Sequence, residues 1–186
     1  MASVTQASER GLAFCAAREA CVLRSYLDTK HLAIGFGDND PSLKEGDTIS
    51  LDEAVRRYVE KAHSYEASIN KIFIGADLSQ TTYDALFSLA WNIGATQLRK
   101  ETQLITAIEA FGSDPKRAYF RDWAGFELTK AKMDAKGPFN FSRRCREALI
   151  LINADYGELT TLKLWPAHKT VRVDPPDLIP MPRFLR

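Results

Sequence analysis

Residues 18–40, REACVLRSYLDTKHLAIGFGDND, decide how this chain is interpreted. They place Glu19 and Asp28 nine positions apart, on the two sides of a predicted junction between a helix and a glycine-containing hairpin. The helix is predicted over residues 4–25, with Glu19 on or beside the apolar stripe that faces the rest of the protein. A carboxylate on such a stripe is costly unless it is paired or functional. The pattern therefore predicts that Glu19 and Asp28 form one wall of a cleft.

Two carboxyl groups that face a common cleft are what glycoside hydrolysis requires. One protonates the leaving oxygen, and the other, ionised, activates water or attacks the anomeric carbon. We predict Glu19 as the acid and Asp28, nearer to solvent in the hairpin, as its ionised partner. A separation of about 5 Å would permit a retaining mechanism and one of about 7 to 9 Å would indicate inversion, and the sequence leaves both open. Spacing alone is a weak signal, because a chain with 24 acidic residues contains such a spacing by chance. The alternative is that Glu19 is a solvated residue at a helix end and Asp28 a residue of a turn.

The middle of the chain is predicted to be helical. Ser50 and Glu53 form a capping box that opens a long helix to about residue 70. A second strong helix covers residues 79–93 and has almost no polar face, so it is predicted to be the central buried helix, with Tyr83 and Trp91 in the core. Weaker helices are predicted at 99–111 and 114–124.

The end of the chain changes in character. A helix that begins near Ser142 is predicted to bury one set of residues, namely Cys145, Leu149 and Ile152. It is predicted to leave its arginines to solvent or to a cleft, namely Arg143, Arg144 and Arg146. Prolines then exclude a helix and predict an extended tail over 161–186. Its apolar side chains are expected to dock on the body of the protein: Trp165, Leu178, Ile179 and Phe184.

Composition sets further limits. A chain of 186 residues can bury one core or two small lobes that share a long helix. Lys and Arg total 25 against 24 acids, and the net charge of +1 argues against a dedicated nucleic-acid surface. Cys15 and Cys21 lie about 9 Å apart along the predicted helix, which is too far for a disulfide. The spacing of these two residues and Cys145 does not match that of metal ligands. Free thiols are therefore predicted. His63 and His168 stand alone, so no metal and no cofactor is predicted.

Three stretches of the chain resemble the phage-type lysozymes of glycoside hydrolase family 24. REACVLRSYLDTKHLAIGFG is similar to the catalytic region of that family, which has a Glu, eight residues, an Asp and then an Ile-Gly-x-Gly hairpin. LSQTTYDALFSLAWNIG is similar to its central helix, and FNFSRRCREALILI to its late Arg-Arg-x-x-Glu helix. The three stretches occur in the family's order and together cover most of residues 10–155.

The resemblance implies a mainly α fold of the α+β lysozyme-like type, with two lobes joined by a long helix and a small β-hairpin region in the N-terminal lobe. In this chain the catalytic domain is expected over 1–160, with a hairpin lobe at about 26–50 and a helical lobe at about 70–160, followed by the tail at 161–186. The implied activity is hydrolysis of the β-1,4 bond between N-acetylmuramic acid and N-acetylglucosamine in peptidoglycan.

The resemblance also implies roles for individual residues. Glu19 takes the general-acid position and Asp28 the general-base or electrostatic position. Arg143 falls where the family places an arginine near the catalytic Glu, and Arg144 is the alternative. Further positions are expected to line the substrate cleft: Phe36, Asn92, Gly94 and Thr102.

The hairpin departs from the family's pattern. The family has a Thr just before Ile-Gly that helps to hold the attacking water, whereas Ala33 stands there in this chain, and the loop after Asp28 is one residue shorter. Because an alanine side chain makes no hydrogen bond, Thr29 and His31 become the candidates for orienting the water. The histidine that commonly follows the second glycine is replaced by Asp38.

The leading hypothesis is an active muramidase, a phage endolysin that binds peptidoglycan glycan strands as a monomer. No signal peptide or membrane-spanning segment is readable, so we expect synthesis in the host bacterial cytoplasm and no membrane insertion. We expect the protein to act on the wall in the periplasm after release by a separate holin. The alternative is a catalytically impaired lysozyme-like protein that binds the cell wall or a partner, which Ala33 motivates. An unrelated helical binding protein is a third hypothesis.

Overall fold

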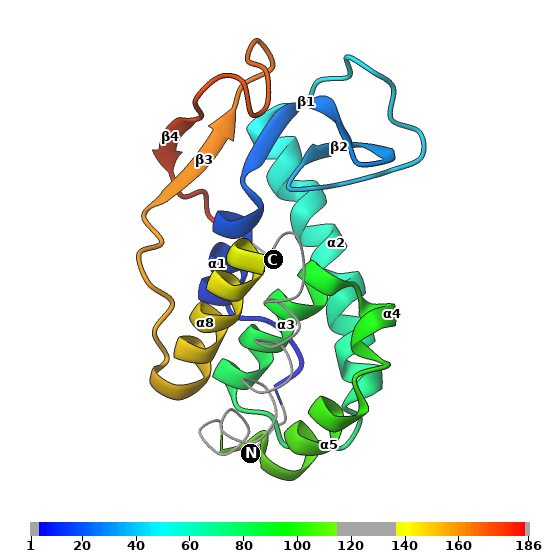
Figure 1. Ribbon diagram of the computed structural model, residues 1–186, viewed down its shortest axis with the longest axis vertical. Helices are drawn as coiled ribbons and strands as arrows, with labels where there is room; N and C mark the ends of the chain where they lie inside the picture. Colours follow the sequence, from blue (N-terminus) through cyan, green and yellow to red (C-terminus); the bar gives the residue numbers. More distant parts are fainter. Residues whose placement is uncertain (1–3, 115–136, 185–186) are drawn as a thin grey trace. The chain divides into compact units, whose positions relative to one another are not determined.

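The computed structural model describes residues 4–114 and 137–184, with the backbone alone at 137–141 (Figure 1). The chain divides into two compact units. The helical unit consists of Met1–Leu12 and Ser64–Gly157, and the sheet unit consists of Ala13–His63 and Glu158–Arg186. The chain passes between the units within helix α1 (Glu9–Glu19), within helix α2 (Leu51–Ile72), and between Gly157 and Glu158. The arrangement is the predicted one, mainly helical with a small β region.

The sheet unit contains four strands in the order β2-β1-β3-β4 (Figure 1). They are β1 (Cys21–Asp28), β2 (His31–Gly35), β3 (Thr161–Trp165) and β4 (Asp177–Pro180). Strand β1 pairs antiparallel with β2 and parallel with β3, and β3 pairs antiparallel with β4. The C-terminal segment is therefore extended, as predicted, but it adds two strands to the sheet, which the sequence did not indicate.

The prediction of one helix over residues 4–25 is wrong at its C-terminal end. Helix α1 stops at Glu19, and Ala20 takes a left-handed conformation with φ of 60° that turns the chain into β1. Strand β1 then satisfies its backbone on both sides, because Val22 pairs with Gly35 of β2 and with Trp165 of β3. Pairing with a segment more than 140 residues away outweighed the helical spacing of the local sequence.

Ser50 caps helix α2 as predicted, and helix α3 (Gln80–Ile93) confirms the helix predicted over 79–93. The Glu53 amide donates to Ser50 Oγ at 3.1 Å at the start of α2. Ser79 caps α3 by accepting from the Thr82 amide, and Gly94 ends that helix with φ of 86°. Every residue from Thr82 to Trp91 is buried, so α3 is the predicted central helix, with Tyr83 and Trp91 in its core.

The other described helices are α4 (Ala95–Leu98), α5 (Thr102–Phe111) and α8 (Gly137–Asn153). Helix α5 confirms most of the helix predicted at 99–111, whereas the one predicted at 114–124 lies, after its first residue, outside the described residues. Helix α8 packs on α3. None of the helices in the described ranges has both the length and the apolar character that crossing a membrane would need.

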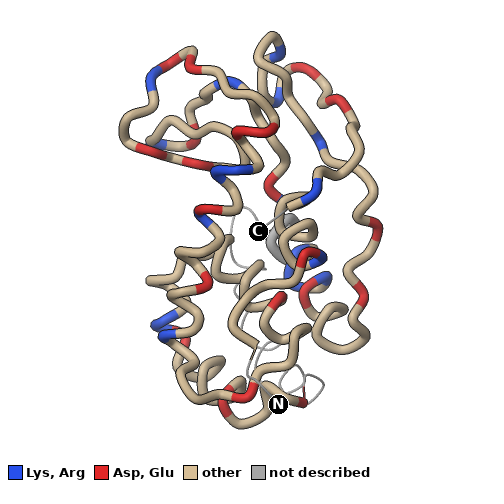
Figure 2. The backbone as a smooth tube through the Cα atoms, turned by 180° about the vertical axis from the view of Figure 1, so that it is seen from behind, with Lys and Arg blue, Asp and Glu red and all other residues tan. Residues whose placement is uncertain are grey.

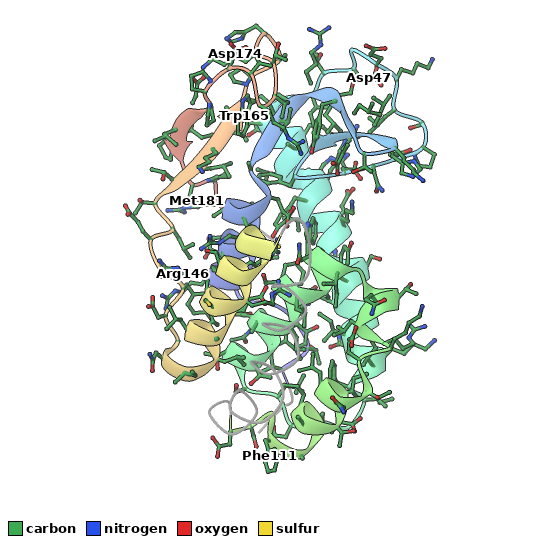
Figure 3. The ribbon with its side chains drawn as sticks, in the orientation of Figure 1. Asp47, Phe111, Arg146, Trp165, Asp174 and Met181 are labelled. Atoms are coloured by element: carbon green, nitrogen blue, oxygen red, sulfur yellow. The ribbon has the colours of Figure 1, made fainter. Side chains whose placement is uncertain are left out.

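The face that α8 buries differs from the predicted one. Arg143 and Arg144 are each only 1% exposed, while Arg146 is exposed at the surface (Figure 3). The three residues predicted to be buried, Cys145, Leu149 and Ile152, are only partly so. Helical periodicity places arginines outside by default, and here an acidic partner in the same helix reverses that preference.

The C-terminal segment docks in the sheet unit through an aromatic residue. Phe184 is buried, and its ring centroid lies 5.2 Å from that of Tyr58 and 6.1 Å from that of Phe36. Trp165 donates from Nε1 to the Asp174 carbonyl at 2.8 Å, which closes the loop between β3 and β4 (Figure 3). Docking of Phe184 is confirmed, whereas Leu178 is 68% exposed and does not dock.

Candidate active site

Glu19 and Asp28 occupy the two ends of one local structure in the sheet unit. Glu19 is the last residue of α1 and is half-buried, and Asp28 is the last residue of β1 and is exposed. The left-handed Ala20 is the only residue between the helix and the strand. The junction predicted from the sequence is thus present, with the intervening residues extended as a strand.

A two-residue turn joins β1 to β2 directly after Asp28. Its first residue, Thr29, has φ of 58°, and the Lys30 amide donates to the Asp28 carbonyl at 2.7 Å. A positive φ is unfavourable for a β-branched residue, and turns of this length usually place glycine or asparagine there. Thr29 and His31, the candidates predicted to orient water, are both exposed at this end of the hairpin.

The strand register places four side chains on one face of the hairpin. Asp28 lies directly opposite His31, and Tyr26 lies directly opposite Ala33. Opposed residues of an antiparallel pair share a face, and residues two apart along one strand do the same. Tyr26, Asp28, His31 and Ala33 therefore lie on the same face.

Tyr26 is the residue on which both carboxylates act. Burial is the main reason why the pKa of Tyr26 is raised to about 12, and the negative charges of Asp28 and Glu19 raise it further. Arg172, in the loop between β3 and β4, opposes that increase. Electrostatic coupling to one phenol places Glu19 and Asp28 in the same neighbourhood of the sheet unit.

Phe36 belongs to the core. It is only 2% exposed, and its ring centroid lies 4.9 Å from that of Tyr58. We assign Phe36 to the packing of the sheet unit, in place of the substrate contact expected from its position in the sequence.

The predicted arginines form a buried charged cluster in the helical unit, centred on Glu147. Glu147 Oε1 accepts from Ser88 Oγ at 2.6 Å, from Arg144 Nη2 at 2.7 Å and from Arg143 Nε at 3.4 Å. Arg143 Nη2 also donates to the Ser88 carbonyl at 2.9 Å, and Arg144 Nη2 to Asn92 Oδ1 at 3.2 Å. Burial raises the pKa of Glu147, against the opposing effect of the two guanidinium groups and of the Ser88 hydroxyl.

The remaining predicted cleft residues lie near the C-terminal end of α3. Asn92 is half-buried and accepts from Arg144, so the predicted Asn92 and Arg144 belong to one hydrogen-bonded group. Gly94 ends α3, and Thr102 is exposed at the start of α5. These residues all belong to the helical unit, whereas Glu19 and Asp28 belong to the sheet unit.

Comparison with known proteins decides the family. Residues 16–136, nearly two thirds of the chain, match the family described as phage lysozyme. The chain belongs to the phage lysozyme family. This makes it a glycoside hydrolase of the lysozyme type. A search of curated proteins found no match.

Solved structures of phage lysozymes and of one other muramidase domain have a similar fold. The endolysin from Escherichia coli O157:H7 phage FAHEc1 is 25% identical, with a TM-score of 0.68 over 82% of this chain and 97% of that one. The muramidase domain of SpmX from Asticaccaulis excentricus is 18% identical (TM-score 0.63, 80% and 98% covered). A mutant of P22 lysozyme is 23% identical (TM-score 0.57, 78% and 97% covered). The last two likenesses support the fold alone.

Asp38, which replaces the histidine of the phage lysozyme pattern, attaches the hairpin to α2. It exchanges two backbone hydrogen bonds of 2.8 Å with Ile34. Its carboxylate lies 3.5 Å from Arg57 Nη1 and 3.7 Å from Lys61 Nζ, and Lys61 also donates to the Gly37 carbonyl at 3.0 Å. Both acidic and basic residues occur in this part of the chain (Figure 2). Asp38 therefore attaches the hairpin to α2 through ion pairs.

Two residues of this lysozyme-family site were missed by sequence analysis. Tyr26 was hidden because residues 21–25 were assigned to a helix, although the spacing of Tyr26 and Asp28 fits a strand with both on one face. Arg172 carried no signal, because it lies 144 residues beyond Asp28 and the loop after β3 brings it near Tyr26.

Proposed function

We propose that this protein is a peptidoglycan muramidase, with Glu19 as general acid and Asp28 as general base. It hydrolyses the β-1,4 bond between N-acetylmuramic acid and N-acetylglucosamine. The observation that carries the proposal is that, in a chain of the phage lysozyme family, Glu19 ends α1 and Asp28 ends β1, the strand that follows it.

The proposed reaction assigns one proton transfer to each acid. The carboxyl proton of Glu19 passes to the bridging oxygen, the bond from that oxygen to C1 of N-acetylmuramic acid breaks, and N-acetylglucosamine leaves as an alcohol. The oxygen of a water molecule forms the new bond to C1, and its proton passes to Asp28. The incoming water attacks the face opposite to the leaving group, so configuration at C1 is inverted.

The proposed setting is lysis of a bacterial host by a phage. The protein is made in the host cytoplasm and acts as a monomer on the glycan strands of the wall in the periplasm. Passage through the membrane depends on a separate holin. The similarity to the FAHEc1 endolysin supports this setting.

The test is digestion of purified peptidoglycan, with the released fragments reduced by borohydride and identified by mass spectrometry. A muramidase produces fragments that end in reduced N-acetylmuramic acid. Glu19→Gln is expected to abolish their release, and Asp28→Asn to lower it at least 100-fold, because each removes one of the two proton transfers. A proton NMR spectrum recorded early in digestion should show the α anomer if inversion occurs.

Glu45→Gln is the matched control. Glu45 is an exposed acid of the same unit, in the loop before α2, so this variant should release fragments at the rate of the unmodified protein. Full activity of Glu19→Gln would contradict the assigned acid. Fragments that end in N-acetylglucosamine or in anhydro-muramic acid would contradict the assigned bond or the hydrolytic reaction.

One observation favours a second function, binding to the cell wall without turnover. Ala33 is 3% exposed in β2 and cannot supply the hydroxyl that the family uses to hold water. A protein of this kind would sediment with insoluble peptidoglycan and release no fragments. The same digestion assay distinguishes the two functions.

A further inference from the structure

The family's hydroxyl next to the attacking water is absent from the hairpin of this protein. A hydrolase that activates water needs polar groups that hold the molecule in line with the carbon to be attacked. Asp28 supplies one such group, and the side chain of Ala33 supplies none. An active enzyme therefore needs a second polar group on the same face of the hairpin.

Register identifies the side chain nearest to the position of the absent hydroxyl. Tyr26 is the cross-strand partner of Ala33, and directly opposed residues in antiparallel strands have Cβ atoms about 4.5–5.5 Å apart. Ala33 is itself buried, at 3% exposed, whereas Tyr26 is half-buried. Asp28 follows Tyr26 by two residues and shares its face.

Charge coupling agrees with this placement. Asp28 and Glu19 both raise the pKa of Tyr26, after the larger effect of burial, so the phenol lies within electrostatic range of both. A pKa of about 12 keeps the phenol protonated and neutral at physiological pH. A neutral phenol oxygen can accept a hydrogen bond from water and does not compete with Asp28 for the proton.

The other polar side chains of the hairpin are placed less favourably. Thr29 lies in the turn, after the last residue of β1, and is exposed. His31 shares the face but lies opposite Asp28, at the open end of the hairpin, where it is also exposed. Tyr26 is half-buried and lies two pairs further in, opposite Ala33.

We propose that Tyr26 is a positioning residue whose hydroxyl holds the attacking water at Asp28, in place of the hydroxyl that Ala33 lacks. The water donates one hydrogen to the Asp28 carboxylate and the other to the Tyr26 oxygen, which leaves a lone pair directed at C1. This inference rests on the proposed function.

The test is a double-mutant cycle between Tyr26→Phe and Ala33→Thr, measured as fragment release from peptidoglycan and as melting temperature. Tyr26→Phe keeps the ring and removes the hydroxyl, so kcat is expected to fall about 10–100-fold with KM little changed. Ala33→Thr alone should change kcat less than about threefold, because the hydroxyl is already supplied. In the Tyr26→Phe protein, the same Ala33→Thr change should restore kcat at least about fivefold.

Tyr156→Phe is the control for loss of a structural tyrosine hydroxyl. Tyr156 donates to Asp84 at 2.5 Å inside the helical unit, so its replacement should lower the melting temperature and leave kcat unchanged. If Tyr26→Phe also lowers the melting temperature, Ala33→Thr still decides, because recovery of kcat without recovery of stability requires a hydroxyl near the water.

Unchanged kcat in Tyr26→Phe would overturn the inference. It would also be overturned if Ala33→Thr changed kcat by the same factor in the Tyr26→Phe protein and in the unmodified protein. Either result leaves the proposed function intact if Glu19→Gln is inactive in the same assay. Activity of Glu19→Gln would instead overturn the proposed function itself.

Discussion

Acidic residues have different surroundings in the two units. In the helical unit, Asp84 is fully buried and accepts four hydrogen bonds: from the Ser8 amide and hydroxyl at 2.7 and 2.5 Å, from Gln80 Nε2 at 2.9 Å and from the Tyr156 hydroxyl at 2.5 Å. Glu147, equally buried, is surrounded by Ser88 and two arginines. Both join segments that are far apart in the chain.

In the sheet unit, the proposed catalytic acids are accessible. Asp28 is exposed at the end of a strand, and Glu19 is half-buried at the end of a helix. The turn after Asp28 is closed by the Asp28 backbone carbonyl, so the Asp28 side chain is not needed to form it. The comparison separates the fully buried acids of the helical unit from the more accessible acids of the sheet unit, and the following changes test that separation.

The largest effect is expected for Glu147→Gln. It removes the negative charge between Arg143 and Arg144, and removal of one partner from a buried ion pair typically costs about 3–5 kcal/mol. Asp28→Asn should change the free energy of unfolding by less than about 0.5 kcal/mol, as is usual at exposed positions. Urea denaturation of both variants measures the difference, and equal costs would remove the distinction between the units.

The contact between Gly11 and Asp84 is expected to give the next largest effect. A Cβ added at Gly11 would lie 2.5 Å from Asp84 Cγ, so Gly11→Ala should destabilise the protein by about 1–3 kcal/mol. Inside a helix, alanine is ordinarily favoured over glycine by about 0.5–1 kcal/mol. In an Asp84→Ala protein the cost of Gly11→Ala should be smaller but keep its sign, because the Cβ at position 84 would still lie 2.9 Å from the added methyl group. An unchanged cost in that background would show that the Asp84 carboxylate does not limit the site.

Cys21 extends the comparison from carboxyl groups to a thiol of the sheet unit. Burial raises the pKa of Cys21 from 9.0 to about 12, so above pH 9 the unfolded chain loses a proton that the folded chain keeps. The contribution of this thiol to the free energy of unfolding is therefore fully present below pH 9 and is lost as the pH rises toward 12, by about 1 kcal/mol at pH 10. Cys21→Ala should flatten this slope in urea titrations between pH 8 and 10. The half-buried Cys145 serves as control, and an equal flattening by Cys145→Ala would contradict the assignment to Cys21.

The smallest effect is expected for Asp38→Asn. Its ion pairs with Arg57 and Lys61 involve side chains that are 24–30% exposed, and such pairs contribute about 0.2–1 kcal/mol. Half-molar salt should remove most of the difference between the variant and the unmodified protein, because it screens charges at the surface. A cost above 2 kcal/mol would group Asp38 with the buried acids of the helical unit.

The sequence predicted the features whose causes are local. The capping residue Ser50 lies where α2 begins, and the helix predicted over 79–93 is present as α3. Burial of Tyr83 and Trp91 followed from the nearly uninterrupted apolar character of α3. The three free cysteines were also predicted correctly, although Cys21 is in a strand.

The errors occurred where a distant partner sets the conformation. Residues 21–25 have helical spacing but pair with β2 and β3, and Phe36 faces Tyr58 and Phe184 in the core. Arg143 is buried where the distant Ser88 carbonyl accepts from its guanidinium, and Glu147 of the same helix accepts from Arg144. Hydrogen bonds and ion pairs between distant residues leave no periodic trace in a sequence.

The sequence alone determined the pair of acids, their nine-residue spacing and the helices around them, because spacing, caps and apolar stripes act within a few residues. Tertiary structure decided that β1 is a strand, that Tyr26 shares a face with Asp28, and that residues 158–184 complete the sheet. These features depend on pairing between segments up to about 140 residues apart, and the free energy of that pairing comes from contacts that form only when the chain is folded.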